Sequence, residues 1–276
     1  MPIQLIEEPV NLYVLPKQIL HENQILVIGD LHGNAVKLMF FLVKHGIASK
    51  LSEDDYEALT LLLSYDVNEI TSEHVLEVKK RLSCIEWKSS NKILLLGDDL
   101  CDRMFNDYWT LLIYEQLVAH KISIEILISN HNVEFILATE LSQSFKPPKA
   151  LKPDITRSMA NLQQLIDDGV VALSEVQSIV DNVYKPNLKC LAYHLADDKR
   201  SICLHSHAPI DLEIIQSLAK CLSTSFQDDT PETLAMSIDA INKAFNYHVK
   251  NKTVHRLLHS EKQRTKSYNY ITMSQT

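Results

Sequence analysis

Glycine is scarce in this chain of 276 residues, with five in all, at positions 29, 33, 46, 97 and 169. Three of them lie in two short polar motifs, GDLHG at 29–33 and GDD at 97–99. A residue without Cβ allows the backbone to turn sharply or to approach a ligand closely. The glycines therefore indicate a candidate site rather than a general property of the scaffold.

Other absences limit the class of protein. The chain starts with MPIQLIEEPV, which has neither the basic segment nor the long apolar segment of a secretory signal peptide. We find no run of about 18 uncharged apolar residues, the length that a membrane-spanning helix requires. A net charge of −8 gives no reason to expect a nucleic-acid partner. The five cysteines lack CxxC spacing, and we interpret them as free thiols in a reducing compartment such as the cytoplasm.

Four apolar runs each end in residue types that bind metal ions. These runs are VIGDLHG at 27–33, LLLGDDLCDR at 94–103, ILISNHN at 126–132 and ICLHSHAP at 202–209. Strands that present Asp, His and Asn at their carboxyl ends can build a two-metal hydrolytic centre. The recurrence is the strongest indication of function in the sequence.

The first two runs offer ligands for a first metal ion and for a bridge. Asp30 and His32 alternate across a turn, so that one ion can take both side chains. Either Asp98 or Asp99 could bridge two ions through its two carboxylate oxygens. We favour Asp98, because Gly97 then stays between the strand and the ligand.

The last two runs offer ligands for a second metal ion. Asn130 could bind through its amide oxygen, and His205 through a ring nitrogen. Mixed nitrogen and oxygen ligation without thiolate suits Mn, Fe or Zn.

The order of predicted elements indicates an α/β fold. Buried strands at 25–29, 92–97 and 122–129 alternate with helices, and a hairpin pairs 189–195 with 201–205. We therefore expect a central β-sandwich or mixed sheets with flanking helices. Residues 1–276 are interpreted as one domain.

Two helical segments do not fit the alternation. Residues 47–91 are predicted to form an inserted pair of helices, which either overhangs the site or only packs against the domain. Residues 230–266 are predicted to be a C-terminal helical segment that begins with Thr230 and Pro231, a favourable cap and first helical residue. Residues 242–267 hold seven Lys or Arg and one acid, which indicates a solvated helix face or a docking surface for a phosphorylated partner.

Together the motifs resemble a known family. GDLHG, GDDLCDR, SNHN and the histidine-rich LHSHAP occur in the order typical of calcineurin-like metallophosphoesterases, and specifically of phosphoprotein phosphatases. The stretch CLAYHLADDKRSICLHSHAP is similar to bacteriophage-type protein phosphatases. The second motif, extended and followed by NDYW, resembles phosphatases that intracellular bacteria export as effectors.

The resemblance implies a role for each candidate residue. Two divalent metal ions are implied, manganese first and iron or zinc as alternatives, and a hydroxide between them attacks phosphorus. The implied metal ligands are Asp30, His32, Asp98, Asn130 and His205. His131 is implied as the general acid, Asp102 as its orienting partner and Arg103 as a phosphate clamp.

Two positions leave alternatives open. His207 is interpreted as a substrate contact, but the sequence HSH also resembles a closing HxH in which both histidines are metal ligands. The family's last ligand, a late histidine, has no match after residue 210. It could come from His248, His255 or His259, or from a segment outside this chain.

The resemblance implies hydrolysis of phosphomonoesters, with a protein phosphorylated on serine, threonine or tyrosine as the substrate. A dinucleoside polyphosphate or cyclic nucleotide hydrolase is the alternative enzyme, and a metal-poor pseudo-phosphatase that binds a partner is the alternative without activity. Action in the cytoplasm or after export into a host cell is expected. The oligomeric state is not indicated by the sequence.

Overall fold

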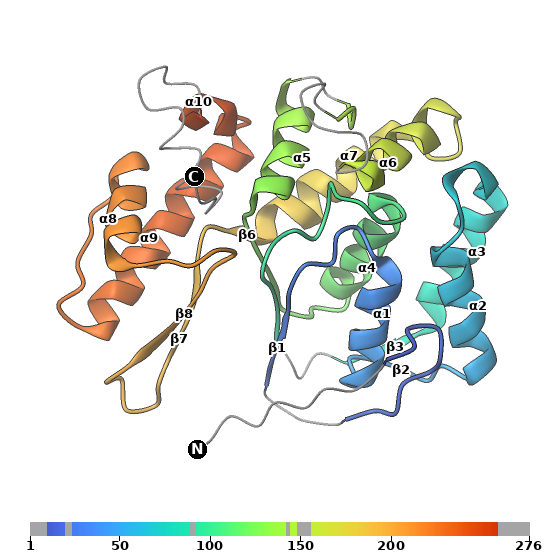
Figure 1. Cartoon of the computed structure of the whole chain (residues 1–276), viewed down its shortest axis with the longest axis horizontal. Helices are drawn as coiled ribbons and strands as arrows, with labels where there is room; N and C mark the ends of the chain where they lie inside the picture. Colours follow the sequence, from blue (N-terminus) through green and yellow to red (C-terminus); the bar gives the residue numbers. More distant parts are fainter. Residues whose placement is uncertain (1–9, 20–23, 89–91, 142–143, 148–155, 259–276) are drawn as a thin grey trace.

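The chain folds around a parallel sheet of four strands, seen edge-on in the middle of Figure 1. The computed structural model describes residues 10–19, 24–88, 92–141, 144–147 and 156–258. The strands are β1 (Ile25–Ile28), β4 (Lys92–Leu95), β5 (Ile124–Leu127) and β6 (Leu188–Lys189), in the order β1-β4-β5-β6. All neighbouring pairs are parallel. The predicted α/β class is confirmed, and the three predicted strands form three quarters of this sheet. The expectation that the first of them is buried is wrong, because β1 is the edge strand and Ile25 and Val27 are 37% and 41% exposed.

A helix follows each of the first three strands of the sheet. They are α1 (Ala35–Lys44), α4 (Asp107–Ala119) and α5 (Asn130–Leu141). Asn34 caps α1 by accepting from Lys37 N, and Asn106 caps α4 by accepting from Tyr108 N and Trp109 N. Because parallel strands require such crossovers, their carboxyl ends all meet at one edge of the sheet. The metal-ligand motifs lie at that edge.

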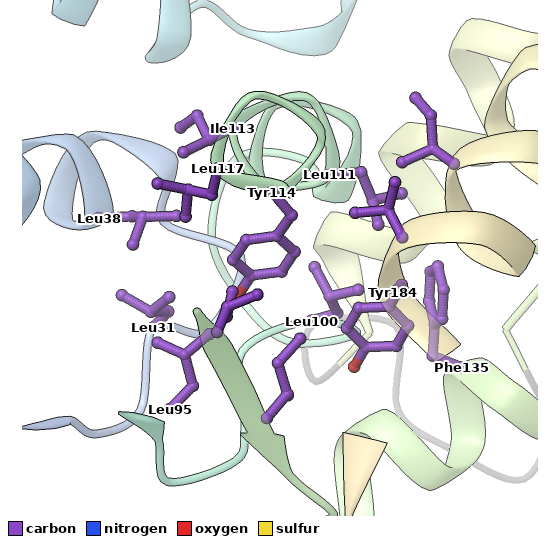
Figure 2. Close-up of a cluster of buried hydrophobic side chains, with 14 of the residues drawn as sticks. Leu31, Leu38, Leu95, Leu100, Leu111, Ile113, Tyr114, Leu117, Phe135 and Tyr184 are labelled. Atoms are coloured by element: carbon purple, nitrogen blue, oxygen red, sulfur yellow. The ribbon is translucent and has the colours of Figure 1, made fainter. Parts of the chain in front are cut away.

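The core lies between the sheet and the helices. Figure 2 shows part of it, where Leu31 and Leu95 from the strand side meet Leu111 and Tyr114 of α4. Tyr184 completes this cluster from η2 (Val180–Tyr184), a π-helical turn that follows α7 (Leu173–Ile179). Burial of these large side chains, at about 1.5–3 kcal/mol for each aliphatic residue, holds the strand ends against the helices.

The predicted insertion is a pair of helices at the edge of the molecule. Its helices are α2 (Glu53–Leu63) and α3 (Ser72–Cys84), joined by the 3-10 turn η1 (Val67–Glu69). Short strands β2 (Ala48–Ser49) and β3 (Glu86–Trp87) pair at its base. The pair packs against α1 and α4, and η1 contacts α6 (Arg157–Asp167). Figure 1 shows it on the side of the molecule away from the hairpin of β7 (Ala192–Leu195) and β8 (Ile202–His205).

The structure divides the strand predicted at 189–195. Only its first residue, Lys189, belongs to β6, and β7 (Ala192–Leu195) pairs instead with β8 (Ile202–His205) in a separate antiparallel hairpin. Asn242 causes the break, because its Oδ1 accepts from Cys190 N and Leu191 N while its Nδ2 donates to Leu191 O. A side chain from α9 (Pro231–Lys250) thus takes the backbone bonds that a continuous strand would use.

The C-terminal segment begins as predicted, with Thr230 as the cap of α9 and Pro231 as its first residue. The other helices here are α8 (Leu212–Cys221) and α10 (Val254–Leu258), and the 3-10 turn η3 (Lys185–Asn187) lies between η2 and β6. The predicted part beyond 258 lies outside the described residues. In the part of the chain that the structure describes, no helix has the length and hydropathy needed to cross a membrane.

Candidate metal centre

The loops that follow β1 and β4 are joined by backbone hydrogen bonds. His32 N donates to Asp98 O at 2.7 Å, and Gly33 N donates to Asp99 O at 2.9 Å. Asp30, His32 and Asp98 all have left-handed backbone conformations, with φ of 43°, 56° and 47°. Non-glycine residues rarely adopt this conformation, and such strain is concentrated at functional sites.

Side chains from these two loops, together with His207 from the segment after β8, form two groups that could each hold a cation. One consists of Asp30, Asp98 and His207, and the other of His32, Asp98 and Asp102. Within each group, one potential ligand atom from each residue lies within 4.8 Å of the others. Asp98 belongs to both groups, which is the position that a bridging carboxylate requires.

Asp98 and Asp99 face opposite sides of their loop. Asp98 is 8% exposed, and its Oδ1 is buried without a hydrogen-bond partner among the described residues. Asp99 is fully buried and accepts from Tyr114 OH at 3.0 Å and from Tyr184 OH at 3.3 Å. It also accepts from Asn132 Nδ2 at 3.1 Å. Both carboxylate oxygens of Asp99 therefore accept hydrogen bonds within the core, whereas one oxygen of Asp98 remains available for a ligand.

Burial raises the pKa of Asp99 to about 6, and the hydrogen bonds from Tyr114, Asn132 and Tyr184 oppose that rise. The carboxylate form is thus the one that its neighbours are arranged to stabilise.

Gly97 stands between β4 and the site with no room for a side chain. Its φ is 97°, and an added Cβ would lie 2.8 Å from both His207 Nδ1 and Ser129 Cβ. His207 Nδ1 lies 2.9 Å from Leu96 O, which orients the ring, and Nε2 is 3.5 Å from Asp98 Oδ1. His207 is therefore held against the second motif by a position that only glycine can occupy.

The other histidine of the HSH sequence has a different place. His205 is the last residue of β8, is half-buried, and belongs to neither of the two groups that the described residues form. The structure thus brings His207 rather than His205 next to Asp98, whereas the alternative HxH interpretation expects both histidines as ligands.

Asp102 connects the two motifs and the third. Its side chain is fully buried, and Oδ2 contacts His32 Nδ1 and lies 3.5 Å from His131 Nε2. Oδ1 accepts from Arg103 N at 2.7 Å and from Arg103 Nε at 2.9 Å. The side chain of Arg103 is otherwise 63% exposed, so its remaining guanidinium N–H groups face the open side of the site.

The ring of His131 is fixed by two contacts. Nδ1 lies 2.7 Å from Cys101 O, to which it donates because a carbonyl oxygen only accepts. Nε2 therefore points toward Asp102. His131 is buried, while Asn130, the first residue of α5, is half-buried at the same strand end.

Three residues that the sequence analysis missed hold the loop after β4. Ser158 Oγ accepts from Asp102 N at 2.8 Å, and Ser158 N donates to Asp102 O at 2.6 Å. Asp107 accepts from Cys101 N with both carboxylate oxygens, at 3.2 and 3.0 Å. Ser129 Oγ accepts from Asp98 N at 3.0 Å. The sequence contains no signal for Ser158, because it lies 56 residues beyond the loop that it holds.

Lys37 was also missed, although its spacing on the helix after GDLHG places it one turn from that motif. Its Nζ donates to Asp30 O at 2.9 Å and to Gly29 O at 3.2 Å. Burial lowers the pKa of Lys37, and the nearby Asp30 carboxylate opposes that effect. Lys37 therefore stabilises the strained turn at Asp30.

The late histidines have other partners. His248 Nδ1 lies 3.0 Å from Thr253 Oγ1, and His255 Nδ1 lies 3.0 Å from the buried carboxylate of Glu140. Neither belongs to the two candidate cation groups of the described residues. His259 lies outside the residues that the structure describes.

The α/β fold carries, at the carboxyl edge of its parallel sheet, carboxylate and imidazole side chains that could hold cations. Residues 92–276 match the family model described as "WipA-like, phosphatase domain", and the chain belongs to this family. The match covers the second, third and fourth motifs.

A solved structure extends the similarity over nearly the whole chain. The crystal structure of the phosphatase domain from the Legionella effector WipB is 27% identical in sequence and superposes with a TM-score of 0.80. The similarity covers 90% of this chain and 91% of that chain, so it also includes most of the residues before 92. No curated protein sequence matches the chain.

Proposed function

We propose that this phosphatase is a dimetal enzyme that hydrolyses phosphomonoesters on serine, threonine or tyrosine side chains of proteins. The observation that supports it most directly is that Asp98 belongs to two groups of potential ligands and that its buried Oδ1 has no hydrogen-bond partner among the described residues. A buried carboxylate oxygen without a partner is costly in free energy, and a cation would remove that cost.

The residues present fit a pair of divalent cations. Carboxylate and imidazole ligands without thiolate suit manganese first, with iron or zinc as alternatives. Asp30, Asp98 and His207 would hold one ion. His32 and Asp98 would contact the other, together with Asn130 and His205 from the third and fourth motifs. Bound ions would activate a water molecule for attack on phosphorus and neutralise the phosphoryl oxygens.

His32 has the support typical of a metal ligand. A metal-binding histidine usually donates its second ring N–H to a carboxylate, which fixes the ring. The contact between His32 Nδ1 and Asp102 Oδ2 matches this pattern and leaves Nε2 as the free ligand atom. This role for Asp102 adds to the one implied by the family resemblance.

His131 is the proposed general acid. Because Cys101 O accepts from Nδ1, Nε2 is the atom that would protonate the departing oxygen of the substrate. Asp102, 3.5 Å away, would orient that proton and attract it until transfer. General acid catalysis of this kind contributes about 10²–10⁴-fold to a rate.

Arg103 is the proposed phosphate clamp. One edge of its guanidinium is bonded to Asp102, which leaves the planar group with free N–H donors at the open side of the site. Such a planar group can bind two phosphate oxygens at once, and its fixed position would lower the entropy cost of binding the substrate.

The proposed place of action in the cell rests only on the similarity to WipB. Since WipB is described as a Legionella effector, we propose that this protein also acts inside a host cell after export. A translocation reporter fused to the chain would give a signal in host cells, and its absence in a strain that can export other effectors would contradict export.

The experiment that tests the function compares substrates and metals. Purified protein would be depleted of metal, reconstituted with Mn, Fe or Zn, and assayed on phosphopeptides, dinucleoside polyphosphates and cyclic nucleotides. The proposal predicts metal-dependent phosphate release from phosphopeptides that chelation abolishes. Preference for the nucleotides would support the alternative enzyme. Absence of any hydrolysis would support a pseudo-phosphatase.

A further inference from the structure

A cavity lined with lysines lies between the π-helical turn η2 and the carboxyl end of α9. Its volume is about 390 Å³, and its walls include Lys185, Lys250, Lys252 and Asp181. This volume is within the range of small-ligand sites, roughly 300–1,000 Å³. Three lysines against one carboxylate leave an excess of two positive charges, although the whole chain has a net charge of −8.

The lysine at the base of the cavity is buried. The side chain of Lys185 is 6% exposed, and its Nζ donates to Asp181 Oδ1 at 2.7 Å. Lys252 Nζ lies 4.0 Å from the other oxygen of the same carboxylate. The single negative charge of Asp181 is therefore shared by Lys185 and Lys252, and it neutralises the positive charge of only one of them. In the part of the chain that the structure describes, no carboxylate is paired with Lys250.

One residue of the cavity wall also has an unpartnered polar atom. Asn246 lines the cavity, and its Oδ1 is buried without a hydrogen-bond partner among the described residues. An unsatisfied buried acceptor costs free energy, so a rotation of this side chain toward the cavity would be favoured by a ligand that carries a donor as well as negative charge. A phosphate monoester has both, because its second pKa of about 6 leaves a protonated oxygen on part of the population.

The backbone around the cavity is unusual for a packing surface. The turn from Val180 to Tyr184 is π-helical, with Lys185 N donating to Val180 O. Single π turns are rare and occur often at functional sites. Here the wider turn directly precedes Lys185.

The cavity is separate from the metal centre. A smaller hollow of about 120 Å³ shares Asp181, Lys185 and Lys252 with it and reaches Thr139, near the end of α5. Asn130, at the metal centre, is the first residue of that helix. Nine residues of helix separate the two positions by roughly 13 Å along the axis. Figure 1 shows α9 on the far side of α5 from α1, whose amino end lies at the metal centre.

We propose that this cavity binds a phosphoryl group, carried either by a small phosphate ester or by a phosphorylated side chain of a protein. Lys185, Lys250 and Lys252 would contact the phosphoryl oxygens, and Asn246 would accept a hydrogen bond from the ligand. The site is independent of the proposed catalytic function, and it gives a structural basis for the excess of basic residues in the C-terminal region.

Nuclear magnetic resonance of the metal-depleted full chain tests the proposal without turnover. The protein would be titrated with inorganic phosphate, with a phosphoserine peptide and with the same peptide unphosphorylated. We expect saturable shifts of the backbone amide resonances at 181–185 and 246–252 with a phosphorylated ligand. Saturation with inorganic phosphate indicates that a small phosphate suffices, and saturation with the phosphopeptide alone indicates a protein ligand.

Matched variants locate the binding. The double change K250Q/K252Q is expected to weaken binding by about tenfold or more, because each lysine supplies a charge-assisted hydrogen bond. Lys243→Gln, at an exposed lysine of α9 outside the cavity, should leave the affinity unchanged. Lys185 is kept, because its removal would leave Asp181 with only the distant Lys252. The absence of saturable shifts, equal shifts with the unphosphorylated peptide, or equal affinity in the double variant would each overturn the proposal.

Discussion

The loops that follow β1 and β4 both contribute to the candidate metal centre, but they are held in place differently. The first loop is stabilised by contacts close in sequence and by its neighbour: Lys37 binds the carbonyl oxygens of Gly29 and Asp30, and His32 N binds Asp98 O. The second loop depends on distant side chains. Tyr184 is 85 residues from Asp99, and Ser158 is 56 residues from Asp102.

This difference explains why the motif GDLHG is easier to recognise in the sequence than the motif that follows β4. A loop that is fixed by its own residues keeps a recognisable sequence, as GDLHG does. A loop that is fixed by other elements can vary, because the residues that position it lie elsewhere. Two adjacent aspartates in the second loop thus have unrelated roles, one facing the site and one facing the core.

The largest expected effect is a difference in activity between a variant of Asp98 and the same variant of Asp99. Asp98→Asn removes the charge shared by both ligand groups, and we expect kcat/KM on a phosphopeptide to fall by about 10³-fold. Asp99→Asn keeps one of the two acceptor oxygens in the core and removes no group of the site, so it should lower kcat/KM far less. Steady-state kinetics with Mn present measures both. Equal losses in the two variants would contradict the assignment of Asp98 to the site.

The next effect concerns the third motif. His131→Gln removes the proposed general acid while its neighbours stay in place, and we expect kcat to fall by about 10²-fold. The loss should be smaller for an aryl phosphate, whose leaving oxygen needs no proton. The same loss for both kinds of substrate would argue against proton transfer by His131.

Stability, rather than activity, should respond when Asp99 is truncated. Asp99→Ala leaves Tyr114 OH, Tyr184 OH and Asn132 Nδ2 without their acceptor in the core. At about 1 kcal/mol or more for each unsatisfied donor, the free energy of unfolding should fall by about 3 kcal/mol. Chemical denaturation of the metal-free protein measures this. Asp98→Ala, whose Oδ1 has no partner, is the matched control and should cost much less.

A smaller effect depends on pH. Burial raises the pKa of Asp107 to about 7 from 3.8, and hydrogen bonds from Ser158 and Cys101 N oppose the rise. Because the folded-state pKa is raised, the stability contributed by this group is fully present below 3.8 and is lost as the pH rises to about 7. The slope for one proton is at most about 1.4 kcal/mol per pH unit.

Asp107→Asn should flatten this dependence. Thermal melting of the metal-free protein from about pH 5 to about pH 8, a range that includes the pKa of about 7, should show a smaller decrease in the variant than in the wild-type protein. An unchanged profile would show that Asp107 does not titrate in this range.

Much of the fold could be predicted because it depends on local patterns. The strands predicted at 25–29 and 92–97, the cap at Thr230 and the helices after the first two strands follow from apolar runs and capping residues close in sequence. The end of β6 could not be predicted in this way. It is fixed by Asn242, which binds the backbone of residues about 50 positions earlier.

The same distinction applies to the candidate site. The motifs placed Asp30, His32, Asp98 and Asp102 at adjacent strand ends, where the structure brings them together. The position of His207 depended on the hairpin β7–β8 and on the space left by Gly97. That space is a property of the folded chain, and no local pattern reveals it.

The number of bound metal ions tests most directly the central claim, that Asp98 is shared by two metal ions. Elemental analysis after reconstitution with manganese and removal of free ions should find two ions per wild-type chain and two per Asp99→Asn chain. In Asp98→Asn, which alters the carboxylate shared by both groups, we expect fewer than one. A wild-type chain that hydrolyses phosphopeptides with no bound metal, or an Asp98→Asn chain that retains both ions, would contradict the account.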